Sequence, residues 1–171
     1  MFDLRLLPSE ITKYAKRYEV SDLESKIIAL RSQIHESKKI PIDDLFDICR
    51  WKSPRKAKNV KTNSQSFIDA ITEFALTTRD ERSRIESLTL LNGVSWGTAS
   101  VILHLYHNER YPILDFRALW SLKVGEPIQY DFDFWVKYTT YCRNLSDRLS
   151  LDMRTLDKGL WQYSKEHQPK R

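Results

Sequence analysis

Residues 88–122, which read LTLLNGVSWGTASVILHLYHNERYPILDFRALWSL, constrain the fold more than any other stretch of this chain. Leu88 and Leu91 are three residues apart, as expected for neighbours on the inner face of one helix. The pair Asn92 and Gly93 then ends that helix, because glycine readily takes the left-handed conformation found just past helix ends. The sequence therefore predicts a tight turn after this helix.

A second helix, a loop with one carboxylate and a third helix are expected beyond the turn. The second helix is predicted over 98–107, and Pro112 prevents its continuation because proline has no amide hydrogen. Asp115 follows in the sequence Ile-Leu-Asp, and residues 116–122 again show a helical pattern. An acid just before a helix is typical of an N-cap, so capping alone would account for Asp115.

The rest of the chain shows helical periodicity and no convincing alternating strand. Aromatic residues at helical spacing near the C-terminal end are expected to lie in the core. The sequence therefore predicts an all-α fold, a compact helical arrangement that contains a helix-hairpin-helix motif. Further helices are expected over 11–18, 21–39, from Asp43 or Asp44 to 49, from Ser64 or Ser66 to 75, over 132–145, and from Asp152 onward.

Length and composition fit one globular domain over 1–171, which is long enough to bury a core without disulfides. The net charge of +5 fits a polyanionic partner, although many proteins are equally basic. The two cysteines, Cys49 and Cys142, argue against a disulfide framework and indicate a reducing cytosol. No apolar run is long enough for a signal peptide or a membrane span, so we expect a cytoplasmic protein without a membrane partner.

A basic segment at 50–61, RWKSPRKAKNVK, contains six basic residues and no acid. Cations neutralise phosphate, and an aromatic ring such as that of Trp51 can stack on a base or wedge between base pairs. The segment is therefore a candidate nucleic-acid surface. It could instead be a solvated basic loop in which Trp51 packs into the core.

The stretch 88–122 resembles the helix-hairpin-helix superfamily of DNA glycosylases, which includes endonuclease III, adenine-mismatch glycosylases and bacterial alkyladenine glycosylases. The family pattern is Leu-x-Gly-Val-Gly-x-x-Thr-Ala followed by apolar residues, then a loop with an aspartate before an apolar helix. The matching positions are Leu91, Gly93, Val94, Ser95, Thr98, Ala99, Ile102 and Leu103. The resemblance implies a helix-hairpin-helix at approximately 82–107 and a catalytic loop at approximately 108–116.

Asp115 falls where the family has its catalytic aspartate. In that role it would stabilise the oxocarbenium-like sugar as the N-glycosidic bond breaks, and would orient or activate water. Bifunctional members carry a lysine eighteen residues earlier, where this chain has Gly97. Because glycine cannot form a Schiff base, the resemblance implies a monofunctional DNA glycosylase that leaves an abasic site.

The turn is expected to bind a DNA phosphate through backbone amides at the start of the second helix. The candidate phosphate-binding residues are Gly93, Val94, Ser95, Gly97 and Thr98. Ser95 replaces the second glycine of the family pattern, which would cost about 1 kcal/mol if the position needed a positive φ. Its hydroxyl could alternatively donate to the phosphate. A plain helical hairpin without a ligand remains the alternative for the whole motif.

The family's wedge into the minor groove comes from the region that corresponds to the basic segment. The candidate wedge and backbone contacts are Arg50, Trp51, Lys52, Arg55 and Lys56, and the candidates for the base pocket are Trp51, Trp96 and Tyr111. Trp96 and Tyr111 could equally be core residues. The expected partner is double-stranded DNA, bound by a monomer that is associated with the nucleoid when on DNA.

No cofactor is expected, although the resemblance allows a cation at the carbonyls of the hairpin turn. Two cysteines exclude the four-cysteine iron–sulfur cluster that some relatives carry, and the histidines and cysteines lack metal-site spacing. Two other functions fit the same residues. The chain could be a non-catalytic helix-hairpin-helix protein that binds nucleic acid, or a helical interaction protein whose basic segment contacts another protein.

Overall fold

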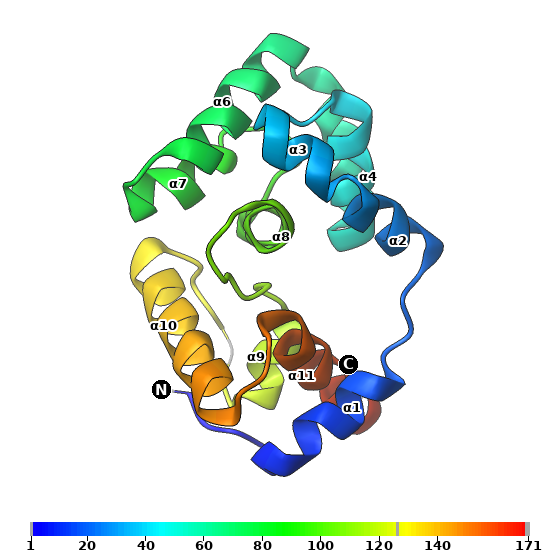
Figure 1. The fold of residues 1–171 in the computed structure, drawn as a ribbon, viewed down its shortest axis with the longest axis vertical. Coiled ribbons are helices and arrows are strands. Elements are labelled where there is room, and N and C mark those ends of the chain that lie inside the picture. Colours follow the sequence, from blue (N-terminus) through cyan, green and yellow to red (C-terminus); the bar gives the residue numbers. More distant parts are fainter. Residues whose placement is uncertain (1, 126, 170–171) are drawn as a thin grey trace. The chain divides into compact units, whose positions relative to one another are not determined.

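The computed structural model describes residues 2–125 and 127–169, and all regular secondary structure in these ranges is helical. The prediction of an all-α fold is therefore confirmed. The chain forms two compact units. The central unit is Val20–Glu109, and the terminal unit combines Met1–Glu19 with Arg110–Arg171. Figure 1 colours the central unit from blue to green, and the terminal unit contains both chain ends. The single domain expected from the chain length stays a prediction.

The central unit is built around its last helix, α8, which packs against α3, α4 and α7 (Figure 1). Most of α8 is buried because its sequence is apolar on every side. Its Tyr106 hydroxyl donates to the Ile27 carbonyl at 2.8 Å, which fixes α8 to α2. The elements are α2 (Asp22–Ala29), α3 (Arg31–Ser37), α4 (Ile42–Lys52), α5 (Pro54–Ala57), the 3-10 helix η2 (Lys58–Thr62), α6 (Gln65–Thr77), α7 (Glu81–Leu88) and α8 (Trp96–Tyr106).

Helix starts in the central unit follow the predicted capping chemistry. The Ser21 hydroxyl accepts the Glu24 amide at 3.1 Å, and the Ser64 hydroxyl accepts the Phe67 amide at 3.2 Å. The single helix predicted over 21–39 is wrong, because the helix divides at Leu30 into α2 and α3. The ψ of Leu30 is −9°, which is outside the range of a continuous α-helix.

Helix α4 begins two or three residues earlier than predicted, because neither Asp43 nor Asp44 is its N-cap. Pro41 is the N-cap of α4, so Asp43 and Asp44 lie in the first turn and not at the cap. Acidic side chains in a first turn interact favourably with the positive end of the helix dipole. Asp43 and Asp44 therefore still stabilise the start of α4 through their charge, although neither is the cap.

The terminal unit joins the two ends of the chain through α11, which packs against both α1 and α9. Gly159 allows close contact with α1, because a Cβ at this position would lie 2.6 Å from the Ile11 carbonyl oxygen. Trp135 and Tyr138 of α10 are buried, as expected for core aromatic residues. The elements are η1 (Pro8–Glu10), α1 (Ile11–Arg17), α9 (Phe116–Ser121), α10 (Phe132–Leu149) and α11 (Met153–His167).

The sequence Gly125-Glu126-Pro127 is typical of a loop, and Glu126 lies outside the described residues. Across the described ranges, no helix is both long enough and apolar enough to cross a bilayer.

Candidate nucleic-acid interface and candidate catalytic carboxylate

The predicted hairpin turn is present in the central unit between α7 and α8. Helix α7 ends at Leu88 and not at Asn92 and Gly93 as predicted, so Leu91 lies outside the helix. Gly93 has a φ of +90° within the turn that follows. The Val94 amide donates to the Leu91 carbonyl at 3.0 Å, which closes the turn. Glycine is required at position 93 because residues with a Cβ rarely adopt this positive φ.

Gly93 also packs directly against the basic segment. A Cβ built on Gly93 would lie 2.8 Å from Val60 Cγ2, 3.0 Å from the Val60 amide nitrogen and 3.1 Å from the Lys56 carbonyl oxygen. Backbone from α5 and η2 therefore lies against the turn without room for a side chain between them. The two features that the sequence suggested separately, the hairpin turn and the basic segment, are adjacent in one unit.

Asn63 connects the same two segments by hydrogen bonds. Its side chain accepts the Asn92 amide at 3.0 Å and donates to the Asn92 carbonyl at 3.0 Å. It also donates to the Val60 carbonyl at 2.9 Å, and only 8% of Asn63 is exposed. Sequence reasoning missed Asn63, because an asparagine just before the Ser64 cap looks like an ordinary loop residue. These bonds fix the turn to the end of the basic segment.

In the first turn of α8, Trp96 and Gly97 are half-buried and Thr98 is 0% exposed, so only the first two residues are open to an anion. The amides of Trp96, Gly97 and Thr98 have no hydrogen-bond acceptor within the described part of the chain, and the Ser95 side chain does not cap the helix. The φ of Ser95 is −97°, so the strain considered for serine at this position does not arise. Orphan amides and the helix dipole together favour negative charge at this end of α8.

The basic segment is helical, so the interpretation of 50–61 as a loop is wrong. It continues α4 and forms α5 and η2. Within it, Arg50 pairs with Asp47 at 3.1 Å, and Lys61 pairs with Asp43. These two cations are partly neutralised by carboxylates of the same helix, α4.

Three other cations of the segment are more accessible to a polyanion. Arg55, Lys56 and Lys58 are exposed, and they have no carboxylate partner among the described residues. Arg55 and Lys56 belong to the predicted wedge and backbone set, whereas Lys58 was not singled out from the sequence. Lys56 is also the residue whose carbonyl lies against Gly93. The cationic surface therefore lies beside the hairpin turn.

The candidate base-pocket residues fall in different units. Trp51 and Trp96 are half-buried in the central unit, whereas Tyr111 belongs to the terminal unit. Tyr111 is 1% exposed, stacks on Trp135 with ring centroids 5.8 Å apart, and has the Arg143 guanidinium 4.7 Å from its ring centroid. We therefore correct the assignment of Tyr111: the structure supports the alternative of a core residue.

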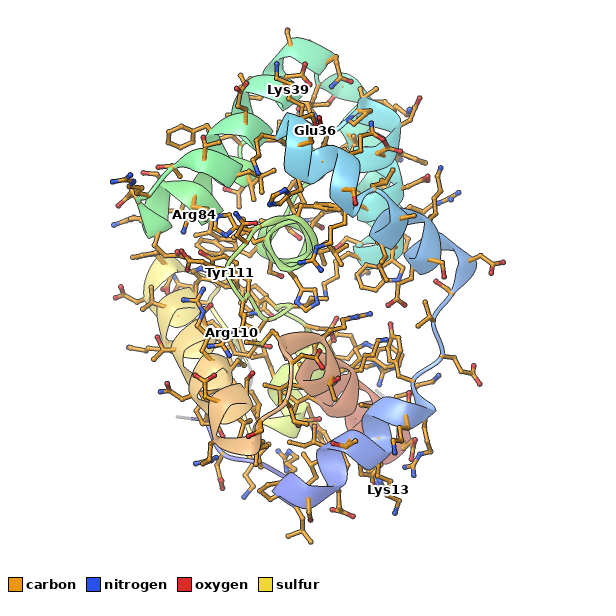
Figure 2. The ribbon with its side chains drawn as sticks, in the orientation of Figure 1. Lys13, Glu36, Lys39, Arg84, Arg110 and Tyr111 are labelled. Carbon is orange, nitrogen blue, oxygen red and sulfur yellow. The ribbon has the colours of Figure 1, made fainter. Side chains whose placement is uncertain are left out.

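Arg110 and Tyr111 both lie beside α10 (Figure 2). Arg110 pairs with Asp147 of α10 at 2.5 Å, and this contact holds the pKa of the Asp147 carboxyl below its usual value. The chain segment that leads into Asp115 is thus fixed to the terminal unit by an ion pair and by buried aromatic packing.

Asp115 is the N-cap of α9, as the capping interpretation predicted. Its Oδ1 accepts the Arg117 amide at 2.8 Å, and the residue is half-buried between buried Leu114 and exposed Phe116. An N-cap bond fixes the carboxylate in one orientation. Capping and catalysis are therefore compatible, because the hydrogen bond that caps α9 also orients the carboxylate.

Comparisons of the chain with protein-family models, curated proteins and solved structures give no match. The resemblance to helix-hairpin-helix glycosylases therefore depends on residues 88–122 alone, and it stays a prediction.

Proposed function

We propose that this protein is a monofunctional DNA glycosylase, which hydrolyses the N-glycosidic bond of a damaged, mispaired or modified base and leaves an abasic site. The observation that carries the proposal is the close packing of the Gly93 turn against the basic segment at Lys56 and Val60. This packing places backbone amides, which can bind one DNA phosphate, beside cations, which can bind adjacent phosphates of the same strand.

The chemical step is assigned to Asp115. A glycosidic bond breaks with positive charge developing on the sugar, and an ionised, oriented carboxylate stabilises that charge. Water attacks C1′ after or during bond cleavage, a proton is lost from that water, and the base leaves with a proton. Gly97 provides no amine for a Schiff base, so the strand stays intact after base release.

The target base must leave the duplex to reach any carboxylate on the protein. In glycosylases generally, favourable contacts with the DNA backbone offset the free-energy cost of unstacking the base. The turn amides and the exposed cations Arg55, Lys56 and Lys58 would supply such contacts in the central unit.

The test is base release from a panel of duplexes, each with one modified or mismatched base. We expect alkali-labile strands from at least one substrate, and Asp115→Asn should abolish the release while duplex affinity stays within about twofold. Full activity of Asp115→Asn, or no release from the whole panel, would contradict the proposal.

A second function is favoured by one observation, the helix-capping role of Asp115. If capping is its whole role, the protein is a non-catalytic helix-hairpin-helix module that binds nucleic acid. Duplex binding that falls steeply with salt, together with no base release, would support this alternative.

A further inference from the structure

The terminal unit carries a second group of cations and aromatic rings, on α9, α11 and the end of α1. We call it the cation–aromatic face. It lies outside the turn and the basic segment, both of which belong to the central unit. Its members are Tyr18, Arg117, Arg154, Lys158, Trp161 and Lys165.

Two rings form the middle of this face. The ring centroids of Tyr18 and Trp161 are 5.2 Å apart with an interplanar angle of 75°, an edge-to-face contact. Both residues are half-buried, so part of each ring remains accessible to solvent. This partial exposure distinguishes them from Trp135 and Tyr138, which are buried in the core of the same unit.

Cations lie over both rings. Arg117 and Lys165 are each 5.3 Å from the Trp161 ring centroid, and Arg154 and Lys158 lie 5.3 and 5.4 Å from that of Tyr18. Of these four, Arg154 also pairs with a carboxylate, that of Asp157 at 2.7 Å. Arg117, Lys158 and Lys165 have no carboxylate partner among the described residues.

A cation held over a ring is bound more weakly than one in a buried ion pair, so a phosphate can attract it at small cost. An aromatic face released in this way can stack on a base, whatever the identity of that base. The face thus has cations that can bind phosphate beside rings that can stack on a base, in four cation–ring pairs.

The face lies close to Asp115. Arg117, whose amide binds the Asp115 carboxylate, is the cation over Trp161. Burial raises the pKa of Tyr18, and the negative charge of Asp115 adds to that rise, as expected for neighbouring groups.

We propose that the cation–aromatic face binds an unpaired nucleotide of DNA, with its base stacked on Trp161 and its flanking phosphates bound by Arg117, Lys158 and Lys165. The inference deepens the proposed function and rests on it in one respect, namely that the ligand of the protein is DNA. It defines the substrate as a nucleotide outside the double helix, in a single strand or extruded from a duplex.

The test is binding of a fluorescently labelled ten-residue oligothymidine, measured by anisotropy. We expect Trp161→Ala to weaken binding about 5- to 100-fold, as stacking of one base on an aromatic ring contributes on this scale. Trp161→Phe retains a ring and should retain most of the affinity. Trp120→Ala is the matched control, because Trp120 is also half-buried in the terminal unit and has Arg5 4.5 Å from its ring centroid.

A charge variant covers the case in which Trp161→Ala fails to fold. Lys158→Gln with Lys165→Gln should lower the slope of log affinity against log salt by about 1.4, since each phosphate contact on a single strand contributes about 0.7. Lys13→Gln with Lys16→Gln removes two exposed lysines from α1 of the same unit and should leave the slope unchanged (Lys13 is labelled in Figure 2).

Three results would overturn the inference: no binding of the oligonucleotide by the unaltered protein, equal losses from Trp120→Ala and Trp161→Ala, or unchanged affinity and slope in all variants. Binding of a polyglutamate peptide in place of the oligonucleotide would assign the face to a protein partner. Base release by the unaltered protein is a separate readout, so these failures are distinguishable from failure of the proposed glycosylase activity.

Discussion

The central and terminal units present charge to a ligand in different ways. In the central unit the candidate contacts are backbone amides, and their positions depend on Gly93 and Asn63 inside the packing. In the terminal unit they are side chains, and Asp115 and Trp161 are half-buried. Substitutions of Gly93 or Asn63 should therefore reduce stability and binding together, whereas substitutions of exposed or half-buried side chains in either unit should separate the two.

The largest effect is expected from Gly93→Ala. The positive φ costs about 1 kcal/mol, and the Cβ contacts with Val60 and Lys56 add roughly 1–3 kcal/mol. We expect the free energy of unfolding to fall by about 2–4 kcal/mol, with loss of duplex binding. Urea unfolding and anisotropy measure the two quantities. Gly125→Ala is the control, because no atom of the described residues, apart from its chain neighbours, lies within 4 Å of a Cβ built there. Equal effects at both glycines would refute the close packing at Gly93.

Asn63→Ala should be the next most harmful change. It removes the bonds to the amide and the carbonyl of Asn92, together with the bond from the buried Asn63 side chain to Val60. The expected loss of stability is about 1–3 kcal/mol. Duplex affinity should fall as well, because the turn is no longer fixed to the basic segment. Asn59→Ala, at an exposed position of η2, should change neither quantity. Normal duplex affinity in a destabilised Asn63→Ala protein would show that the turn and the segment act separately.

Removing the exposed cations should change binding without changing the fold. The triple substitution of Arg55, Lys56 and Lys58 by Gln should lower the salt slope of duplex affinity by about 3, at about 0.9 per phosphate contact. Its melting temperature should stay within a few degrees of the original, since these side chains have no ion-pair partner in the described structure. A salt slope that does not move would mean that DNA binds elsewhere.

Substitutions of Asp115 can separate the stability that comes from its capping hydrogen bond from the stability that comes from its negative charge. Asparagine caps helices about as well as aspartate, so Asp115→Asn should leave stability nearly unchanged. Asp115→Ala removes the cap on α9 and should cost about 0.5–2 kcal/mol. Thermal unfolding of both variants gives the comparison. Equal destabilisation by Asn and Ala would indicate that the charge, and not the hydrogen bond, stabilises the helix start.

The smallest effect concerns pH. Burial lowers the pKa of His107, and the nearby Arg84 lowers it further. The unfolded chain then binds a proton near pH 6.5 more readily than the folded one, so stability is full above that pH and falls as pH drops below it. His107→Gln should reduce this fall in urea unfolding between pH 7 and 5. His35→Gln, in the same unit, is the control. If both substitutions reduce the loss of stability between pH 7 and 5 equally, that loss does not come from His107.

The sequence predicted the helices and the turn because those depend on local chemistry. Ser21, Ser64 and Asp115 cap helices as their types and positions indicated. The break at Leu30 was missed, since leucine is a good helix former and nothing local marks a division there. The helical form of the basic segment was missed because its charge suggested a loop.

The sequence identified several individual residues of the candidate sites, but it did not predict which residues lie next to one another in the fold. Gly93 was identified, yet the reason that it must be glycine includes Val60 and Lys56, which are distant in sequence. Asn63, Lys58 and Trp161 carry no motif, and only their tertiary neighbours distinguish them from ordinary surface or core residues. Tyr111 was placed near a pocket by its closeness to Asp115 in sequence, but its side chain packs on Trp135.

The central claim is that this protein releases a base and leaves the strand intact. The most direct measurement follows one end-labelled duplex carrying a susceptible base, with and without alkali after incubation, and with borohydride in a parallel reaction. The account predicts strand breaks only after alkali, no protein–DNA adduct with borohydride, and neither product with Asp115→Asn. Strands that resist alkali, or breaks before alkali together with a trapped adduct, would contradict it.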